Sequence, residues 1–253
     1  PWTELYDPSR MDLSATLMEP KTDPVFQQLK GSMRAEMAGW EPEFWQQYLA
    51  QYYGYVSQID RAIGDIFNAL KVSGDWENTW IVFASDHGDH LGNWGLLGKA
   101  DPYETAARIP MIIKPAASSG IELRGESLDF CTNWIDLYGT ILDMAKLPGW
   151  REDEHLETRS LMPLLTEKSP DWKNETALFW GRESDEYSMA FWRDDLKVVR
   201  ARRPDGEANE IYNVRQDPLE RDNLYAFLKD TNVGEEILKA AKSWGDGQEK
   251  RFR

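Results

Sequence analysis

The sequence predicts an α/β fold followed by a small antiparallel sheet. Three observations lead to this prediction. A long amphipathic pattern is followed by a short apolar segment, that segment ends in a polar loop, and short strand-like segments alternate with turns after about residue 165. A long helix, a tight turn and a buried strand in succession are typical of an α/β unit. Short alternating segments separated by polar or glycine-containing turns are typical of antiparallel strands.

The N-terminal region contains an irregular stretch and then a long helix. Residues 1–40 include Pro8, Pro20 and Pro24 and show little periodicity, so we expect an irregular extended segment laid over the rest. From Glu43 to Leu70, apolar residues recur at steps of three and four, which predicts one amphipathic helix packed against the core. Pro42 suits the first turn of that helix, and Ser73-Gly74 is expected to end it.

The central region predicts short strands and a second helix. The apolar run 80–84 indicates a strand buried on both faces, as in a parallel sheet covered by helices. A second strand is expected at 109–113. A helix is expected over 129–145, with Cys131 inside it as a buried structural thiol, and a Pro-Gly turn follows at 148–149.

The C-terminal region predicts an antiparallel sheet with a closing helix. Strands are expected at 177–180, 187–192, 197–200 and 210–213, and the helix at 235–244. The change in pattern places a boundary between two units. We therefore assign residues 1–168 to an α/β unit and residues 169–253 to the smaller unit.

Composition excludes several classes of partner. The chain of 253 residues carries a net charge of −15, so polyanions such as nucleic acid and anionic membranes are not expected to bind it. No apolar run approaches the roughly 18 residues that a membrane helix needs. The single cysteine excludes an intrachain disulfide and does not indicate the redox compartment. The sequence makes no prediction of localisation.

The residues with the richest chemistry are Ser85-Asp86-His87-Gly88-Asp89-His90, directly after the first predicted strand. Ligands of open α/β sheets bind beyond the carboxyl ends of strands. A carboxylate and an imidazole suit zinc, and the carboxylate also suits calcium or magnesium. The alternatives are a solvated surface pair and a helix cap at Asp86. His90 is interpreted as structural. Two ligands do not complete a site, so the others must come from elsewhere.

Two further charged positions follow the metal motif. Lys99, in Leu96-Leu97-Gly98-Lys99, can bind a tetrahedral oxyanion if the loop brings it near a metal, and is otherwise an ordinary surface lysine. Glu104 and Arg108 stand four residues apart with the glutamate first, the favourable order for a structural helical ion pair.

Several segments occur in an order that resembles the sulfatase family of the alkaline phosphatase superfamily. They cover most of the chain: 5–8, 53–60, 64–70, 78–88, 97–99, 103–104, 108–110, 136–142, 160–165, 210–220 and 223–224. The resemblance implies a partial alkaline-phosphatase-like sheet flanked by helices, followed by a small C-terminal antiparallel sheet with a closing helix. It also implies that the chain corresponds to the C-terminal half of such an enzyme.

The resemblance assigns roles to three residues. Asp86 and His87 match the family's ligands to a divalent metal, calcium first, with zinc or manganese as alternatives, and Lys99 matches the residue that contacts the sulfate ester substrate. The family's nucleophile is a formylglycine made from a Cys-x-Pro/Ala-Ser-Arg motif near the N-terminus, and the surroundings of Cys131 do not match that motif. Many relatives also carry an acidic residue and a histidine where this chain has Asn93-Trp94.

These departures leave three hypotheses open. The first is the C-terminal portion of a metal-dependent sulfuric ester hydrolase, inactive as this chain alone, with its formylglycine in an N-terminal half. The second is a phosphonate monoester or phosphodiester hydrolase of the same superfamily, and the third is a non-catalytic sulfatase-like module. In each case we expect an uncovered sheet surface that a homo-oligomer or an N-terminal half would cover, and weak metal binding by this chain alone.

Overall fold

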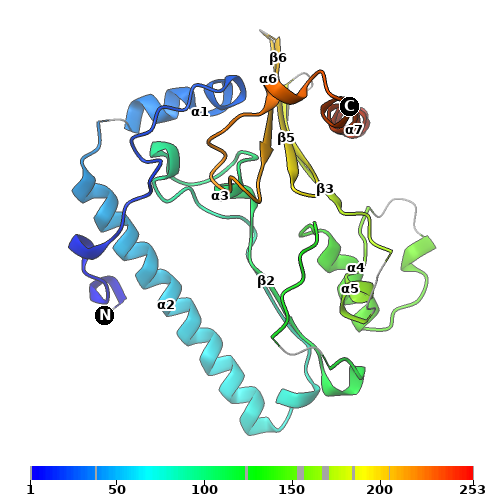
Figure 1. The fold of residues 1–253 in the computed structure, drawn as a ribbon. Coiled ribbons are helices and arrows are strands. Elements are labelled where there is room, and N and C mark those ends of the chain that lie inside the picture. The colour runs from blue at the N-terminus through cyan, green and yellow to red at the C-terminus, as the bar shows by residue number, and fades with distance from the viewer. Residues whose placement is uncertain are drawn as a thin grey trace.

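The fold is built around two separate antiparallel sheets, described here from a computed structural model (Figure 1). The structure describes residues 2–37, 39–122, 125–152, 157–166, 171–183, 186–204 and 206–252. It confirms the predicted class: a mixed α/β part with helices is followed by a four-stranded antiparallel sheet and a closing helix. The predicted boundary between residues 168 and 169 lies outside the described residues, so the division into two units stays a prediction.

Two helices form one side of the molecule (Figure 1). Helix α2 spans Pro42–Ser73, with proline in its first turn and Gly74 ending it at a left-handed φ of 83°, as the sequence predicts. Helix α1 spans Pro24–Met37, where the sequence analysis expected an irregular segment. That expectation was wrong because the groups that stabilise the start of α1 lie far along the chain, as described below.

The N-terminal segment crosses α2 at a glycine. A Cβ atom on Gly54 would lie 2.4 Å from the carbonyl oxygen of Trp2, so only glycine permits this close approach. The Tyr6 hydroxyl and Ser57 Oγ are 2.8 Å apart beside the crossing. The short 3₁₀ helices of the chain are η1 Trp2–Glu4, η2 Pro8–Arg10, η3 Trp76–Asn78, η4 Asn93–Gly95, η5 Ala117–Ser119 and η6 Trp150–Glu152.

Strands β1 (Ile81–Ala84) and β2 (Met111–Lys114) form a two-stranded sheet. They pair antiparallel, Ile81 opposite Lys114, so the expected parallel sheet buried on both faces is wrong for the described residues. One face of this sheet packs against the cluster of Leu137, Leu161 and Leu164. On the other face Phe83 and Ile112 pair and are 37% and 63% exposed.

Three short helices accompany this sheet: α3 (Glu104–Ala107), α4 (Asp136–Met144) and α5 (Met162–Thr166). Helix α4 begins later than the predicted range 129–145, because the segment before it forms hydrogen bonds to residues at the start of the second sheet. The Cys131 N–H donates to Asn174 Oδ1 at 2.6 Å, and Asn133 Nδ2 donates to the carbonyl of Ala177 at 2.8 Å. Cys131 is therefore outside the helix and half-buried, which corrects the expectation of a buried helical thiol.

The second sheet is a meander in the order β3-β4-β5-β6. All neighbouring strands are antiparallel, as predicted, and they span β3 Glu175–Glu183, β4 Glu186–Arg193, β5 Leu196–Arg203 and β6 Gly206–Asn213. Helix α6 (Tyr225–Leu228) leads to the closing helix α7 (Asn232–Phe252). The apolar face of α7, including Ile237 and Ala241, packs against strands β4, β5 and β6.

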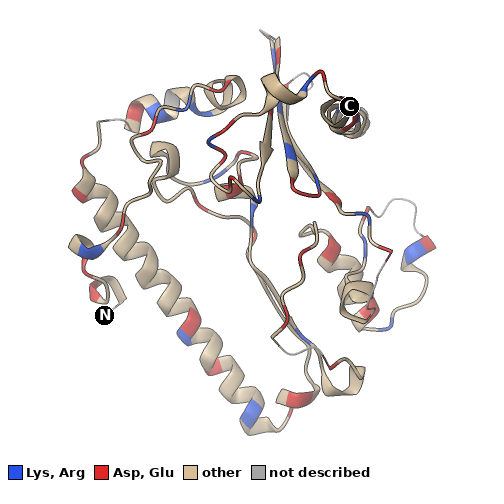
Figure 2. Ribbon diagram, viewed as in Figure 1, with Lys and Arg blue, Asp and Glu red and all other residues tan. Residues whose placement is uncertain are grey.

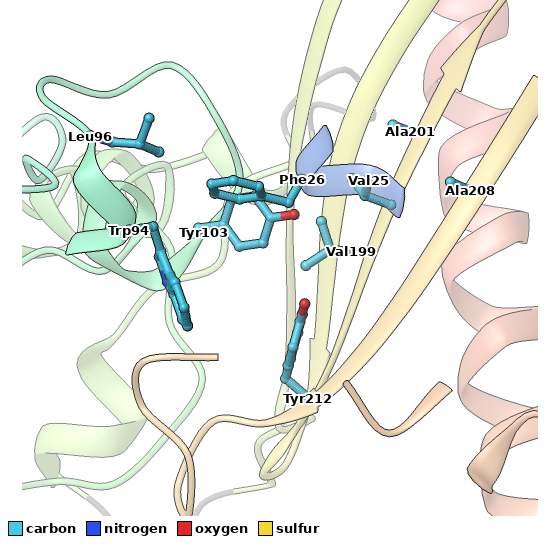
Figure 3. Close-up of a cluster of buried hydrophobic side chains, with 9 residues drawn as sticks. All are labelled: Val25, Phe26, Trp94, Leu96, Tyr103, Val199, Ala201, Ala208 and Tyr212. Carbon is cyan, nitrogen blue, oxygen red and sulfur yellow. The ribbon is translucent and has the colours of Figure 1, made fainter. Parts of the chain in front are cut away.

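The opposite face of the meander joins the two parts of the chain (Figure 3). Phe26 of α1, Trp94 of η4 and Tyr103 pack with Val199 and Tyr212 of the sheet. The aromatic rings meet edge to face, Phe26 lying 5.6 Å from Tyr103 between centroids. This cluster places the loop after β1 against the C-terminal sheet.

Charged residues of both signs are scattered along the helices, the loops and the second sheet (Figure 2). The strands of the first sheet carry one charged residue, Lys114. No helix among the described residues is long and apolar enough to cross a membrane.

Candidate active site

Strand β1 ends where the predicted metal motif begins, and Gly88 fixes the path of the loop. The Gly88 N–H donates to the carbonyl of Ala106 at 2.8 Å. A Cβ atom on Gly88 would lie 2.2 Å from the Thr105 carbonyl oxygen, so any other residue would push the loop away from α3. The glycine is needed for this close approach of two backbones.

Asp86 and His87 lie side by side at the surface. His87 Nε2 is 3.3 Å from Asp86 Oδ2, and the side chains are 41% and 78% exposed respectively. His87 Nδ1 is 2.8 Å from the Gly88 carbonyl oxygen, which can only accept, so Nδ1 carries the proton in the neutral ring. The Nε2 lone pair then faces Asp86 Oδ2. A histidine metal ligand commonly donates its other N–H to a backbone carbonyl in this way.

This geometry fits a shared divalent cation. Two ligand atoms 3.3 Å apart can both lie about 2.0–2.4 Å from one ion. Among the described residues, no group of three or more His, Cys, Asp and Glu side chains is arranged to hold a metal. These residues thus offer two ligands, a carboxylate and an imidazole.

The other two chemically rich residues of the motif face inward. Asp89 accepts hydrogen bonds from the Leu91 N–H at 2.9 Å and the Tyr48 hydroxyl at 3.3 Å. Burial and then the Asp89 carboxylate raise the pKa of Tyr48 to about 12. His90 is fully buried, with Nδ1 2.7 Å from Thr105 Oγ1 and Nε2 2.6 Å from Asp101 Oδ2. Both nitrogens have protein partners, so His90 supports the loop.

The loop from Asp89 to Asp101 is strained and pinned at its ends. The His90 N–H donates to the Gly98 carbonyl at 2.8 Å. Three non-glycine residues have left-handed φ values, Leu91 at 50°, Trp94 at 56° and Ala100 at 76°. Each costs on the order of 1–2 kcal/mol, which must be offset by surrounding contacts. Strain of this kind clusters at functional sites.

Lys99 extends from this loop with an exposed side chain. Its carbonyl oxygen accepts a hydrogen bond from the buried Lys30 of α1 at 3.0 Å. The described structure records no direct bond between the Lys99 side chain and Asp86 or His87. The hydrogen bond from the His90 N–H to the Gly98 carbonyl holds the backbone that precedes Lys99 beside the last residue of the metal motif.

Asn93 and Trp94 anchor the middle of the loop. Asn93 Oδ1 accepts from Ser14 Oγ at 2.6 Å, and its amide donates to the His90 carbonyl at 2.6 Å. Trp94 is buried and donates from Nε1 to the Leu219 carbonyl at 3.1 Å. In this chain the two side chains serve the fold of the loop.

Sequence reasoning missed a buried ion cluster behind α3. Lys197 of β5 is 2.9 Å from Glu104 Oε1 and 2.7 Å from Glu220 Oε1. Glu220 Oε2 accepts the Glu104 N–H at 2.8 Å, and Trp192 Nε1 donates to Glu104 at 2.8 Å. Glu104 thus forms its ion pair with Lys197. Arg108 lies just after the end of α3, so the predicted ion pair between Glu104 and Arg108 within one helix is wrong. The partners are 93 and 116 positions away, beyond any local signal.

Cys131 lacks the character of a nucleophile. Burial, followed by the charge of Asp194, raises the pKa of its thiol to about 11. Its Sγ lies 3.7 Å from the Asp194 carbonyl oxygen. The thiol is therefore protonated at neutral pH.

Comparison with known proteins gives consistent family matches. A family model described as Sulfatase matches residues 17–147, and one described as N-sulphoglucosamine sulphohydrolase, C-terminal, matches residues 92–243. The multifunctional alkaline phosphatase superfamily protein PehA of Trinickia caryophylli is 36% identical over 51% of this chain and 24% of its own length. An arylsulfatase of Clostridium perfringens is 30% identical over 69% of this chain and 35% of its own.

The fold is shared with solved structures. The phosphonate monoester hydrolase of Agrobacterium radiobacter aligns with a TM-score of 0.77 at 22% identity, over 98% of this chain and 53% of that one. The chain thus spans about half the length of that structure, and less of the two relatives above.

Proposed function

Because the chain belongs to the sulfatase family of the alkaline phosphatase superfamily, we propose that it is part of a metal-dependent sulfuric ester hydrolase, to whose active site it supplies Asp86, His87 and Lys99. The observation that carries this proposal is the exposed Asp86–His87 pair beyond β1, with Oδ2 and Nε2 3.3 Å apart. Calcium is the cation we propose first, with zinc and manganese as alternatives.

The proposed roles follow from the chemistry of each group. A bound divalent cation supplies Lewis-acid stabilisation of negative charge. Asp86 and His87 would hold that cation, His87 through Nε2 because Nδ1 is bonded to the Gly88 carbonyl. The ammonium group of Lys99 would contact a sulfuryl oxygen of the sulfate ester and stabilise the charge that develops as the ester bond breaks.

We further propose that this chain is inactive alone. A nucleophile is needed, and Cys131 is unsuitable because its pKa is raised to about 11 and its neighbours differ from the Cys-x-Pro/Ala-Ser-Arg motif. The formylglycine and the remaining metal ligands would come from a preceding part of a longer polypeptide. The proposal agrees with the share of its relatives' length that the chain spans.

A second candidate is a phosphonate monoester or phosphodiester hydrolase. The Agrobacterium radiobacter phosphonate monoester hydrolase shares the fold over 98% of this chain. The same metal pair and lysine can serve a phosphoryl group, because both reactions develop charge on non-bridging oxygens.

Parallel assays on the complete polypeptide distinguish the candidates. We expect release of 4-nitrophenol from 4-nitrophenyl sulfate, and loss of that activity when a chelator removes the metal. Asp86→Ala, His87→Ala and Lys99→Ala should each lower kcat/KM by about 100-fold or more. Asp230→Ala, which removes another exposed carboxylate, is the matched control and should leave the rate unchanged. Turnover of phosphate diesters or phosphonate monoesters without sulfate ester hydrolysis would support the second candidate and refute the first.

A further inference from the structure

The buried ammonium of Lys30 connects helix α1 to the loop that carries Lys99. Lys30 is 4% exposed, and its Nζ lies 3.0 Å from the Lys99 carbonyl oxygen and 3.1 Å from Asp101 Oδ2. A lysine is seldom buried unless its charge is paired, and here one head group pairs with both backbone and carboxylate. It bonds to the peptide group of the residue proposed to contact the sulfate.

Asp101 extends this connection to the other end of the loop. Its Oδ2 lies 2.6 Å from His90 Nε2, and its Oδ1 accepts the Tyr103 N–H at 3.0 Å. Burial alone would raise the pKa of Asp101, but the hydrogen bond and charge of His90, the charge of Lys30 and the Tyr103 N–H hold it below its usual value. Lys30, Asp101 and His90 therefore form one buried network that fastens residue 90 and residues 99–101 together.

The backbone on both sides of Lys99 has unfavourable dihedral angles that this network must stabilise. Gly98 and Ala100 have φ values of 74° and 76°, a region that alanine rarely adopts. A left-handed residue persists only where surrounding contacts determine it. The hydrogen bond from Lys30 acts on the carbonyl between these two turns, so it sets the orientation of the peptide that follows Lys99.

We propose that Lys30 is a positioning residue, which fixes the backbone at Lys99 so that the Lys99 ammonium is held toward the reacting sulfuryl group. This inference rests on the proposed function of Lys99. Lys30 itself is too deeply buried to contact the substrate. Its effect on the reaction is exerted through the placement of Lys99, and a misplacement of about 1 Å can lower a rate about 100-fold.

A double-mutant cycle on the complete polypeptide tests the inference. Lys30→Met keeps the apolar stem but removes the donor, and should lower kcat/KM for 4-nitrophenyl sulfate by about 10–100-fold. In a Lys99→Ala background the same change should cost less than about 2-fold, because the group that it positions is already absent. Lys30→Arg, which keeps a charged donor, should recover part of the rate.

Lys197→Met is the control, since it removes an equally buried lysine whose ion pairs are to Glu104 and Glu220. Its effect should be the same with and without Lys99. If Lys30→Met were also equally harmful in both backgrounds, Lys30 would have only a structural role and the inference would be overturned.

Amide hydrogen exchange on the same polypeptide gives a readout that does not depend on turnover. Lys30→Met should reduce protection of the His90 amide, which donates to Gly98, by about 10-fold or more, while strands β4 and β5 keep theirs. Unchanged protection of the loop would overturn the inference even if activity fell. Failure of the proposed function can be distinguished from failure of this inference. In the first case the unsubstituted polypeptide would hydrolyse no sulfate ester, while Lys30→Met would still reduce protection of the loop.

Discussion

Glu220 is a completely buried carboxylate that shares a single lysine with a second carboxylate, Glu104. Burial, opposed in part by the charge of Lys197 and reinforced by the charge of Glu104, raises the pKa of Glu220 to about 7. Lys197 keeps its proton well above neutral pH, because the two carboxylates more than compensate for its burial. Glu220 is thus the member of the cluster that titrates near neutrality.

This titration predicts a loss of stability as the pH rises. Glu220 binds its proton more tightly in the folded state, so its contribution is complete below the ordinary glutamate pKa and disappears as the pH rises through about 7. We expect the unfolding free energy, measured by urea denaturation, to fall by about 1–3 kcal/mol between pH 5 and pH 8. Glu220→Gln, which imitates the protonated form, should remove this decrease. An equal decrease in both proteins would contradict the prediction.

Single residues divide clearly into those that sequence could predict and those that it could not. Asp86 and His87 were predicted because their motif is contiguous and follows a strand, and Lys99 because the segment around it resembles the sulfatase family. Lys30 and Lys197 were not, because a buried lysine has no signature in sequence until its distant partners are placed around it. The roles of Asp86, His87 and Lys99 stay predictions, to be decided by the assays above.

At the scale of elements, α1 shows how a helix can depend on a distant cap. The N–H groups of Val25 and Phe26 have no partner within the helix, and both donate to Glu210 Oε1 of β6, at 2.6 Å and 3.0 Å. The other oxygen of Glu210 accepts from the hydroxyl groups of Tyr103 and Tyr212, each at 2.8 Å. One buried carboxylate therefore accepts hydrogen bonds from two N–H groups of the helix and from two tyrosine hydroxyl groups.

Removal of this carboxylate should release α1. Glu210→Ala leaves two N–H groups and two hydroxyl groups without their acceptor, so we expect a loss of about 3–5 kcal/mol in unfolding free energy. Hydrogen exchange should show the amides of α1 losing protection before those of α7. Glu236→Ala, an exposed glutamate on α7, should cost less than about 0.5 kcal/mol. A similar loss of unfolding free energy for both substitutions would show that Glu210 does not stabilise α1.

Elements with a local signal were predicted well. Helix α2 and the strands of the meander follow their hydrophobic periods and end at turn residues, so their neighbours in sequence were sufficient. Helix α1 was missed because its cap is 185 positions away. The direction of pairing of β1 and β2 was wrong because four apolar residues look alike in parallel and antiparallel sheets.

The molecule as a whole presents two exposed apolar patches that none of its described elements covers. Phe83 and Ile112 form an exposed pair on the open face of the first sheet. Ile59 and Ile66, in the second half of α2, are 55% and 60% exposed. Exposed apolar patches of this kind mark interaction sites. We propose that a preceding half of the longer polypeptide covers these patches, and that copies of the isolated chain cover them for each other.

This proposal predicts that the isolated chain associates. Sedimentation equilibrium should show an average mass that rises with concentration. Ile112→Lys places a charge at a position that is 63% exposed, so it should reduce association with little loss of stability. Phe227→Lys, at a 79% exposed position on α6, is the control and should leave association unchanged. A chain that stays monomeric at all concentrations would contradict the proposal.

The buried ion cluster of Glu104, Lys197 and Glu220 also limits how early the loop of the candidate site can gain its full support during synthesis. Glu104 and Glu220 are separated by 116 positions. At about 5–20 residues per second, a ribosome needs roughly 6–23 s to make that stretch. Throughout this interval the segment bearing Asp86 and His87 has already been translated, but Glu220 has not. A nascent chain would therefore expose the proposed metal ligands, Asp86 and His87, for several seconds before the buried ion cluster at α3 is complete.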